Sequence, residues 1–224
     1  MKRLTLPTIW LWFAVLMVTS WIGAAWVGFR MESTGMERYR FLLWNLFLAW
    51  IPYWAAMGLW IIHQVKKHWP VAVRRISLAA LGAIWFLFLP NAPYLVTDLV
   101  HFRRILGGGM WGWSDIFMMM IFIWTGLLLG ALSLHLVHLA IALTFGRAAG
   151  WGFVAGMVPL TAIGVYVGRE FRWNSWEVIT DPEKLLSDLN RLLEVDALQF
   201  ILMASVMIGI VYGTIHMLLA RPVR

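Results

Sequence analysis

Residues 115–143 read DIFMMMIFIWTGLLLGALSLHLVHLAIAL, and no residue after Asp115 in this stretch carries a formal charge. The hydrocarbon core of a bilayer is roughly 30 Å thick, and a helix crosses it with about 20 apolar residues. The stretch is long enough to do so. We therefore predict that it forms a transmembrane helix.

Apolar runs of the same kind occupy most of the chain. Of its 224 residues, 62% are hydrophobic and only 13% are charged, whereas soluble domains carry about 25% charged residues. We predict an all-α fold, a polytopic membrane helix bundle with about six transmembrane helices, in a single membrane domain over residues 1–224. The predicted spans are 8–29, 41–63, 76–89, 115–143, 151–168 and 197–219.

The first span has an alternative interpretation. It follows Lys2 and Arg3 and contains the small residues Gly23, Ala24 and Ala25, which is also the pattern of a cleaved signal peptide. Its length and its tryptophans favour a spanning helix. Cleavage would leave the topology of the remaining spans unchanged.

Acidic residues are distributed unevenly between the two predicted sides of the membrane. The 18 Lys and Arg residues divide evenly, whereas all 11 acidic residues fall on one side. The other side is purely basic and includes a loop with Lys66, Lys67, Arg74 and Arg75. Basic loops face the cytoplasm. We therefore predict a bacterial cytoplasmic (inner) membrane protein with both termini in the cytoplasm. The net charge of +7 is explained by these basic loops, so we expect membrane lipid as a partner and no nucleic acid.

The third span is interrupted by residues 90–93, which read Pro-Asn-Ala-Pro. Proline disfavours helical geometry in the residue before it, so we expect Leu89 and Ala92 to leave helical geometry and the span to break there. After the break, Tyr94, Thr97, Asp98 and His101 recur at helical spacing. They are predicted to form one polar face within an apolar segment.

A second polar segment, 168–177, follows the fifth span on the same predicted side. Its two arginines, Arg169 and Arg172, could clamp a phosphate or carboxylate group through paired hydrogen bonds. Alternatively, they neutralise the carboxylates of Asp98, Asp115 or Glu177 across the bundle. Both roles are compatible, since an ion pair inside the membrane can also be a functional site.

Ionisable groups at membrane depth usually pair with one another or face a cavity, so these two segments define a candidate site. Its candidate catalytic residues, which are also the candidate ligands of a divalent metal cofactor, are Asp98, His101 and Asp115. The alternative is a polar cluster that only stabilises the break. Candidate binding residues on the same side are Asn45, Asn91, Tyr94, Thr97, Arg169, Arg172, Asn174, Trp176 and Glu177.

Histidines gather on the opposite side. His135 and His138 are three residues apart, and His63 and His216 end their spans. A His-x-x-His pair can bind a metal, but no carboxylate lies nearby in the sequence. We interpret these histidines as interfacial polar residues.

Two further patterns concern packing. Glycines recur four residues apart in the last three spans, which predicts close approach of these helices. The pairs are Gly126/Gly130, Gly152/Gly156, Gly164/Gly168 and Gly209/Gly213. The leucines of residues 182–195 form one stripe of a short amphipathic helix, which is predicted to lie at the membrane interface.

Three segments carry a resemblance to a known family. They are 44–52 (WNLFLAWIP), 88–101 (FLPNAPYLVTDLVH) and 168–177 (GREFRWNSWE). They resemble the bacterial integral-membrane family known as domain of unknown function 1361, which implies a multi-span membrane protein without an assigned activity. The family usually has Asp where this chain has Glu177, and often Arg where it has Trp44, so the resemblance assigns these two residues no role.

Three functions remain open at this point. The first is an enzyme that acts on a lipid-linked or envelope substrate with an anionic group, at the extracytoplasmic end of the bundle. The second is a component of a proton- or ion-coupled transporter, with the broken helix as its relay. The third is a structural or assembly factor of the membrane. The chain contains no cysteine, which excludes thiol chemistry.

Overall fold

The computed structural model describes residues 6–34, 37–65, 70–104, 109–173, 180 and 189–220. Six long helices account for most of them, and no strand occurs in these ranges. The long helices are α1 (Leu6–Thr34), α2 (Arg40–Gln64), α3 (Val71–Phe88), α5 (Gly109–Phe145), α6 (Arg147–Glu170) and α9 (Val195–Ala220). The short ones are η1 (Glu37–Tyr39), α4 (Asn91–Tyr94), η3 (Leu95–Arg104) and η4 (Leu189–Leu193).

Within the described residues, six helical segments are long and apolar enough to cross a membrane. They are Thr8–Ser33, Arg40–Gln64, Val71–Val100, Gly112–Phe145, Arg147–Glu170 and Val195–Leu219. This confirms the predicted all-α membrane bundle with six spans. The helices extend several residues beyond some predicted spans, because helical geometry continues past the apolar core into the interface.

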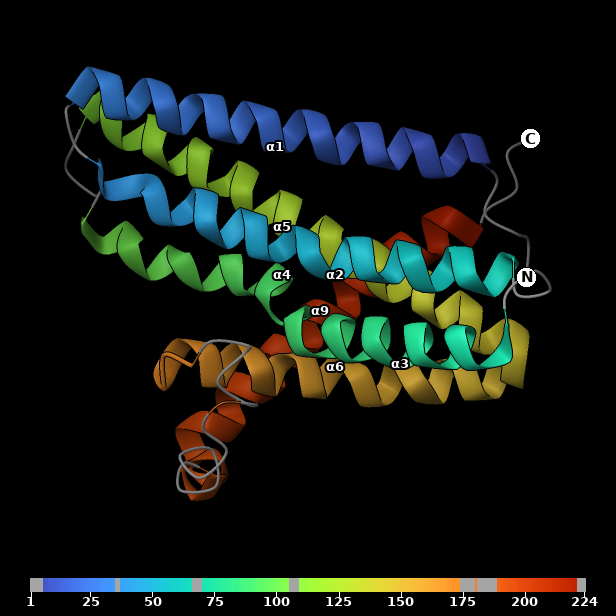
Figure 1. The fold of residues 1–224 in the computed structure, drawn as a ribbon. Coiled ribbons are helices and arrows are strands. Elements are labelled where there is room, and N and C mark those ends of the chain that lie inside the picture. Colours follow the sequence, from blue (N-terminus) through green and yellow to red (C-terminus); the bar gives the residue numbers. More distant parts are fainter. Residues whose placement is uncertain are drawn as a thin grey trace.

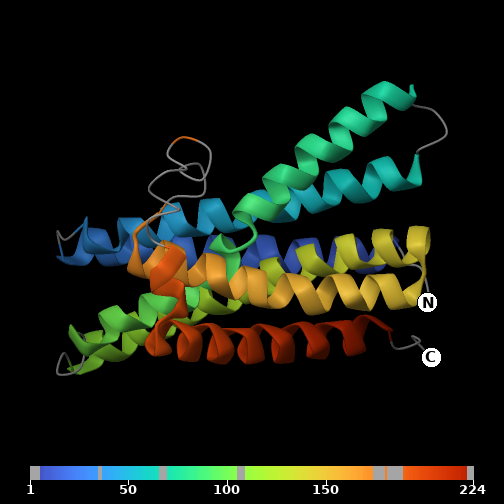
Figure 2. The same ribbon diagram turned by 90° about the horizontal axis from the view of Figure 1, so that it is seen from below.

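The helices run alternately up and down, and both chain termini lie at the same end of the bundle (Figure 1). The central element is α5, which packs against α1, α2, α4, α6 and α9. In contrast, α3 packs mainly against α2 and leans away from the rest of the bundle, as Figure 2 shows. Trp85 is the buried residue of α3.

The predicted break of the third helix is confirmed, but not at Leu89. Leu89 keeps helical angles (φ −53°, ψ −40°) and Ala92 lies within the helix α4 (Asn91–Tyr94), so the expectation that these two residues leave helical geometry is wrong. The break follows from Pro90 and Pro93, which have no N–H to donate. The side chain of Asn91 donates to the carbonyl of Phe88 (3.1 Å) in place of a helical N–H, and the chain then continues as α4 and the 3-10 helix η3.

Three glycines hold this break against neighbouring helices. A Cβ atom at Gly126 of α5 would lie 2.5 Å from the carbonyl oxygen of Ala92, and one at Gly130 would lie 3.2 Å from the Cβ of Ala92. A Cβ at Gly164 of α6 would collide with the ring of Pro90. Only glycine allows neighbouring backbones to come this close. Close approach was predicted for Gly126, Gly130 and Gly164 from the recurrence of glycine every four residues.

The other glycines predicted to mediate packing do not do so within the described residues. A Cβ at Gly152, Gly156, Gly209 or Gly213 would meet no atom within 4 Å. That part of the prediction is wrong, because no neighbouring helix comes close to these four glycines. Residues 182–188 of the predicted amphipathic helix lie outside the described residues, and the other half of its range contains the 3-10 helix η4 and the first residue of α9.

Candidate functional site

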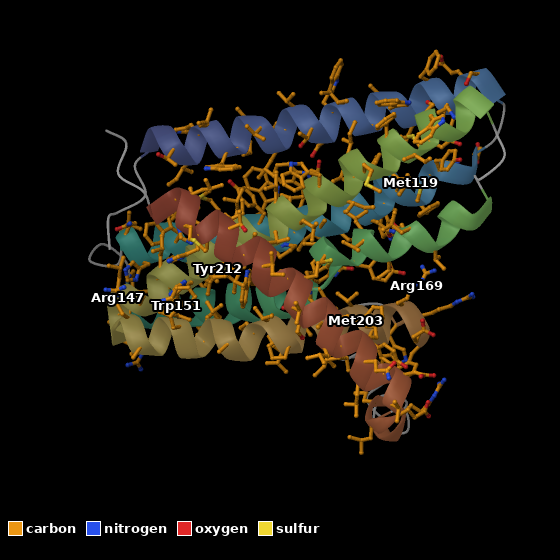
Figure 3. All side chains as sticks on the ribbon, turned by 180° about the vertical axis from the view of Figure 1, so that it is seen from behind. Met119, Arg147, Trp151, Arg169, Met203 and Tyr212 are labelled. Atoms are coloured by element: carbon orange, nitrogen blue, oxygen red, sulfur yellow. The ribbon has the colours of Figure 1, made fainter. Side chains whose placement is uncertain are left out.

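A polar cavity of about 660 Å³ lies where α2, the break and the end of α6 meet. Sites for small molecules commonly have volumes of about 300–1,000 Å³. The cavity is at the end of the bundle remote from the termini, where Figure 3 shows Arg169. Its lining residues include Trp44, Asn45, Pro90, Asn91, Tyr94, Gly168, Arg169, Glu170, Arg172 and Trp173.

Asp98 lies behind this cavity and supports one of its walls. The side chain of Asn45 lines the cavity and donates to Oδ2 of Asp98 at 3.1 Å. Asp98 itself is only 2% exposed, and the positive charge of Arg169 acts on it. The carboxyl group therefore fixes the orientation of the Asn45 amide at the cavity surface.

Arg172 occupies an unusual backbone conformation at the cavity. Its φ is 55°, in the left-handed region that costs residues with a Cβ roughly 1–2 kcal/mol. Such strained residues cluster at functional sites. The conformation is compatible with a role of Arg172 in ligand binding, since its side chain lines the cavity and is exposed.

This strain gives a stability test. Arg172→Gly removes the steric cost of positive φ, while Arg172→Ala removes the same guanidinium and keeps the cost. We expect the glycine variant to be more stable than the alanine variant by about 1 kcal/mol, measured as thermal unfolding in one detergent. Equal melting temperatures would show that position 172 is unstrained.

A second, largely apolar cavity of about 530 Å³ adjoins the first. Both cavities are lined by Arg169 and Glu170, so they meet at the end of α6. The second cavity also contains Thr97, whose hydroxyl donates to the carbonyl of Tyr94 at 2.7 Å. Its other walls come mainly from apolar residues of η3 and α9, among them Val96, Val100, Phe200, Met203 and Met207.

Most of the predicted binding residues thus come together. The first cavity is lined by Asn45, Asn91, Tyr94, Arg169 and Arg172, and the second by Thr97 and again Arg169. Sequence reasoning missed Trp44, Glu170 and Trp173 as lining residues. The position of Trp44 directly before Asn45, a predicted binding residue, was a signal that could have identified it. Three predicted residues, Asn174, Trp176 and Glu177, lie outside the described residues, and of His101 only the backbone is described, within η3.

Asp115 has a different environment from Asp98. Arg30 of α1 binds its carboxylate through two hydrogen bonds, Nε to Oδ1 at 2.5 Å and Nη2 to Oδ2 at 2.8 Å. The hydroxyl of Tyr39 donates to Oδ2 at 2.5 Å. All three residues are buried, and Asp115 lines neither cavity described above. The group joins α1, η1 and α5, while a catalytic or metal-binding role of Asp115 stays a prediction.

Six apolar helices, with an internal break beside a polar cavity, are the features of a multi-pass membrane protein. The model of a protein family described as "Protein of unknown function (DUF1361)" matches residues 44–211. The chain belongs to this family, as the three sequence segments indicated. No curated protein and no solved structure matches the chain. The matched range contains every residue that lines the two cavities.

Proposed function

We propose that this protein binds the anionic head group of a lipid-linked envelope substrate at the extracytoplasmic face of the bacterial cytoplasmic membrane and acts on it there. One observation carries the proposal. Arg169 lies where the polar cavity and the apolar cavity meet. An amphiphilic anion fits this arrangement. Its head group would occupy the polar cavity, its hydrocarbon chain would occupy the apolar cavity, and Arg169 would lie beside the anionic group between them.

The polar cavity has the chemistry to bind an anion. The guanidinium groups of Arg169 and Arg172 line it and present planar sets of N–H donors that match phosphate and carboxylate oxygens. Asn45 and Tyr94 add neutral polar groups. Trp44 and Trp173 supply aromatic surface on which a sugar or other ring can pack.

The apolar cavity has the chemistry to hold a hydrocarbon chain. Met203 and Met207 contribute flexible side chains to its wall, and methionine adapts readily to varied apolar ligands. Met203 is 65% exposed on α9, a surface that would face lipid. Figure 3 shows Met203 on the same side of the bundle as Arg169, so a chain could enter from the bilayer.

The distribution of charge supports the proposed orientation. Both termini, the first turns of α3 with Arg74 and Arg75, and the start of α6 with Arg147 lie at one end of the bundle. The 18 Lys and Arg residues divide evenly between the two predicted sides, but all 11 acidic residues fall on the other side, so this side is purely basic, and cytoplasmic loops carry an excess of basic residues. Arg169, which lines the cavity, lies at the other end (Figure 3), and this supports the proposal that the cavity opens on the extracytoplasmic side.

The transporter alternative has less support among the described residues. A proton or ion path would need polar groups that continue from Asp98 through the bundle. Next to the break, the interior instead holds a space of about 20 Å³ with a mostly apolar lining, including Leu89, Leu127, Leu134 and Val211. Thr161 and Tyr212 are the polar residues of this lining, so a continuous polar path has less support than the binding site.

Titration of the purified protein with short-chain lipids tests the proposal. Trp44 and Trp173 line the cavity, so their fluorescence should report binding of phosphatidylglycerol added to the detergent micelles. We expect Arg169→Gln to weaken phosphatidylglycerol binding about tenfold, the effect of one lost charge-assisted hydrogen bond. Phosphatidylcholine should bind weakly to both proteins.

The matched control is Arg147→Gln, which removes an arginine from the opposite end of the bundle (Figure 3). It should bind phosphatidylglycerol as the wild type does. Equal affinity of the wild type and Arg169→Gln would contradict the proposal. A parallel titration with inorganic phosphate separates a lipid from a soluble anion, since phosphate alone should bind much more weakly if the apolar cavity contributes.

A further inference from the structure

Three histidines come together at the end of the bundle opposite the proposed lipid site. His135 and His138 lie on α5 and His216 on α9, and one ring nitrogen from each lies within 4.8 Å of the other two. His135 is 4% exposed and His138 is fully buried. They are buried because α9 packs along α5 and Trp151 of α6 covers the rings of His138 and His216, while their place at the membrane interface stays a prediction.

We propose that His135, His138 and His216 bind one first-row transition-metal ion of the kind that imidazole prefers, with Zn²⁺ as the simplest case. The site would link α5 to α9 at the end where the chain termini lie. It is separate from the candidate metal ligands Asp98, His101 and Asp115 and does not depend on the proposed lipid-binding function.

The spacing of the nitrogens fits a metal site. Nδ1 of His135 and Nδ1 of His216 are 3.3 Å apart. Two imidazole nitrogens at about 2.0–2.1 Å from a tetrahedral zinc ion are about 3.3–3.4 Å apart. His138 completes the set, since one of its ring nitrogens lies within 4.8 Å of the ligand atoms of the other two histidines. Three neutral ligands leave a fourth position for water or hydroxide, as in three-histidine zinc sites.

Tyr212 of α9 provides the supporting hydrogen bond that metal-binding histidines generally have. Its hydroxyl lies 2.5 Å from Nδ1 of His138, which leaves Nε2 of that ring as the nitrogen to bind the metal. Figure 3 shows Tyr212 beside Trp151 and far from Arg169. The contact fixes the His138 ring, so that this ligand is held in place before a metal arrives.

The hydrogen bonding of His138 also points to a missing ligand. Its Nε2 is buried and has no hydrogen-bond partner, which costs about 1–3 kcal/mol for a polar group. Gly150 of α6 makes room for this edge of the ring, since a Cβ there would lie 2.8 Å from Nε2. A cluster of three histidines held together only by hydrogen bonds would leave that nitrogen unsatisfied.

Elemental analysis of the purified full-length protein tests the site. The wild type is stripped with a chelator, incubated with zinc chloride, and passed through a desalting column. We expect about one zinc ion per chain in the wild type, and loss of most of it in His135→Gln, His138→Gln and His216→Gln. His63→Gln, on a histidine outside the cluster at the end of α2, and Asp98→Asn should bind zinc as the wild type does.

Failure of the stripped wild type to take up zinc, cobalt or copper would overturn the proposal. So would zinc that persists in all three cluster variants, because it would then be bound elsewhere. Loss of zinc in Asp98→Asn alone would assign the metal to the other end of the bundle and likewise overturn it.

Two measurements keep the test valid if a cluster variant does not fold. X-ray absorption at the zinc edge of the wild type should show nitrogen ligands at about 2.0–2.1 Å with imidazole scattering, and a shell of oxygen ligands alone would overturn the site. Tyr212→Phe keeps all three ligands, and we expect its zinc affinity to fall about 10–100-fold. Unchanged affinity would remove Tyr212 from the proposal.

Discussion

Replacement of Arg30 by methionine is expected to destabilise the protein by about 3–5 kcal/mol, the usual cost of removing one partner from a buried ion pair. Methionine replaces the aliphatic stem of arginine but removes both hydrogen bonds of the guanidinium to the carboxylate of Asp115, which keeps the hydrogen bond from Tyr39. Both members of the pair are buried, with side chains 6% exposed. Unfolding in a mild detergent, followed by circular dichroism, measures the effect.

Two controls separate the buried charge from the loss of an arginine in general. The double variant Arg30→Met, Asp115→Leu should recover most of the lost stability, because an apolar pair often replaces a buried ion pair at little cost. Arg40→Gln breaks the exposed pair with Glu37 and should change stability by less than about 1 kcal/mol. If Arg30→Met were as mild as Arg40→Gln, the buried pair would not stabilise the bundle.

Replacement of Gly126 by valine should destabilise the protein by about 2–3 kcal/mol, in the range for an overpacked core. Its Cβ would lie 2.5 Å from the carbonyl oxygen of Ala92 and 2.5 Å from Cδ1 of Leu95. The leucine can move, but the carbonyl belongs to the backbone of the break. The variant should therefore push α4 away from α5, with a lower melting temperature and weaker lipid binding.

Gly156→Val is the matched control, because a Cβ at Gly156 meets nothing within 4 Å. We expect its stability to stay close to that of the wild type, since the side chain faces outward and a valine costs a helix less than a glycine does. Equal destabilisation of the two variants would show that the break does not depend on close contact with Gly126.

The residues of the helix break also form part of the wall of the polar cavity. Pro90 and Asn91 line the polar cavity, while Ala92 packs on Gly126 and Gly130. The interruption of the third helix thus exposes polar groups to the cavity on one side and is held by glycines on the other. Variants of the glycines should therefore change ligand binding without touching a lining residue.

The sequence predicted the features that depend on local composition. Apolar runs such as 115–143 gave the spans, since the length of a helix across a bilayer follows from hydropathy alone. Pro90 and Pro93 predicted the break, because they cannot donate helical hydrogen bonds. Asn45, Tyr94 and Arg169 were placed at one end of the bundle, because alternating spans determine at which end each residue lies.

Contacts between helices required the tertiary structure. The order of spans does not tell how each helix is rotated or which helix is its neighbour, and both decide which side chains meet. Asp115 therefore pairs with Arg30, 85 positions away in the chain, and His216 of α9 reaches His135 of α5. Local hydropathy fixes where a residue lies along the membrane normal, whereas helix packing selects its partners in the membrane plane.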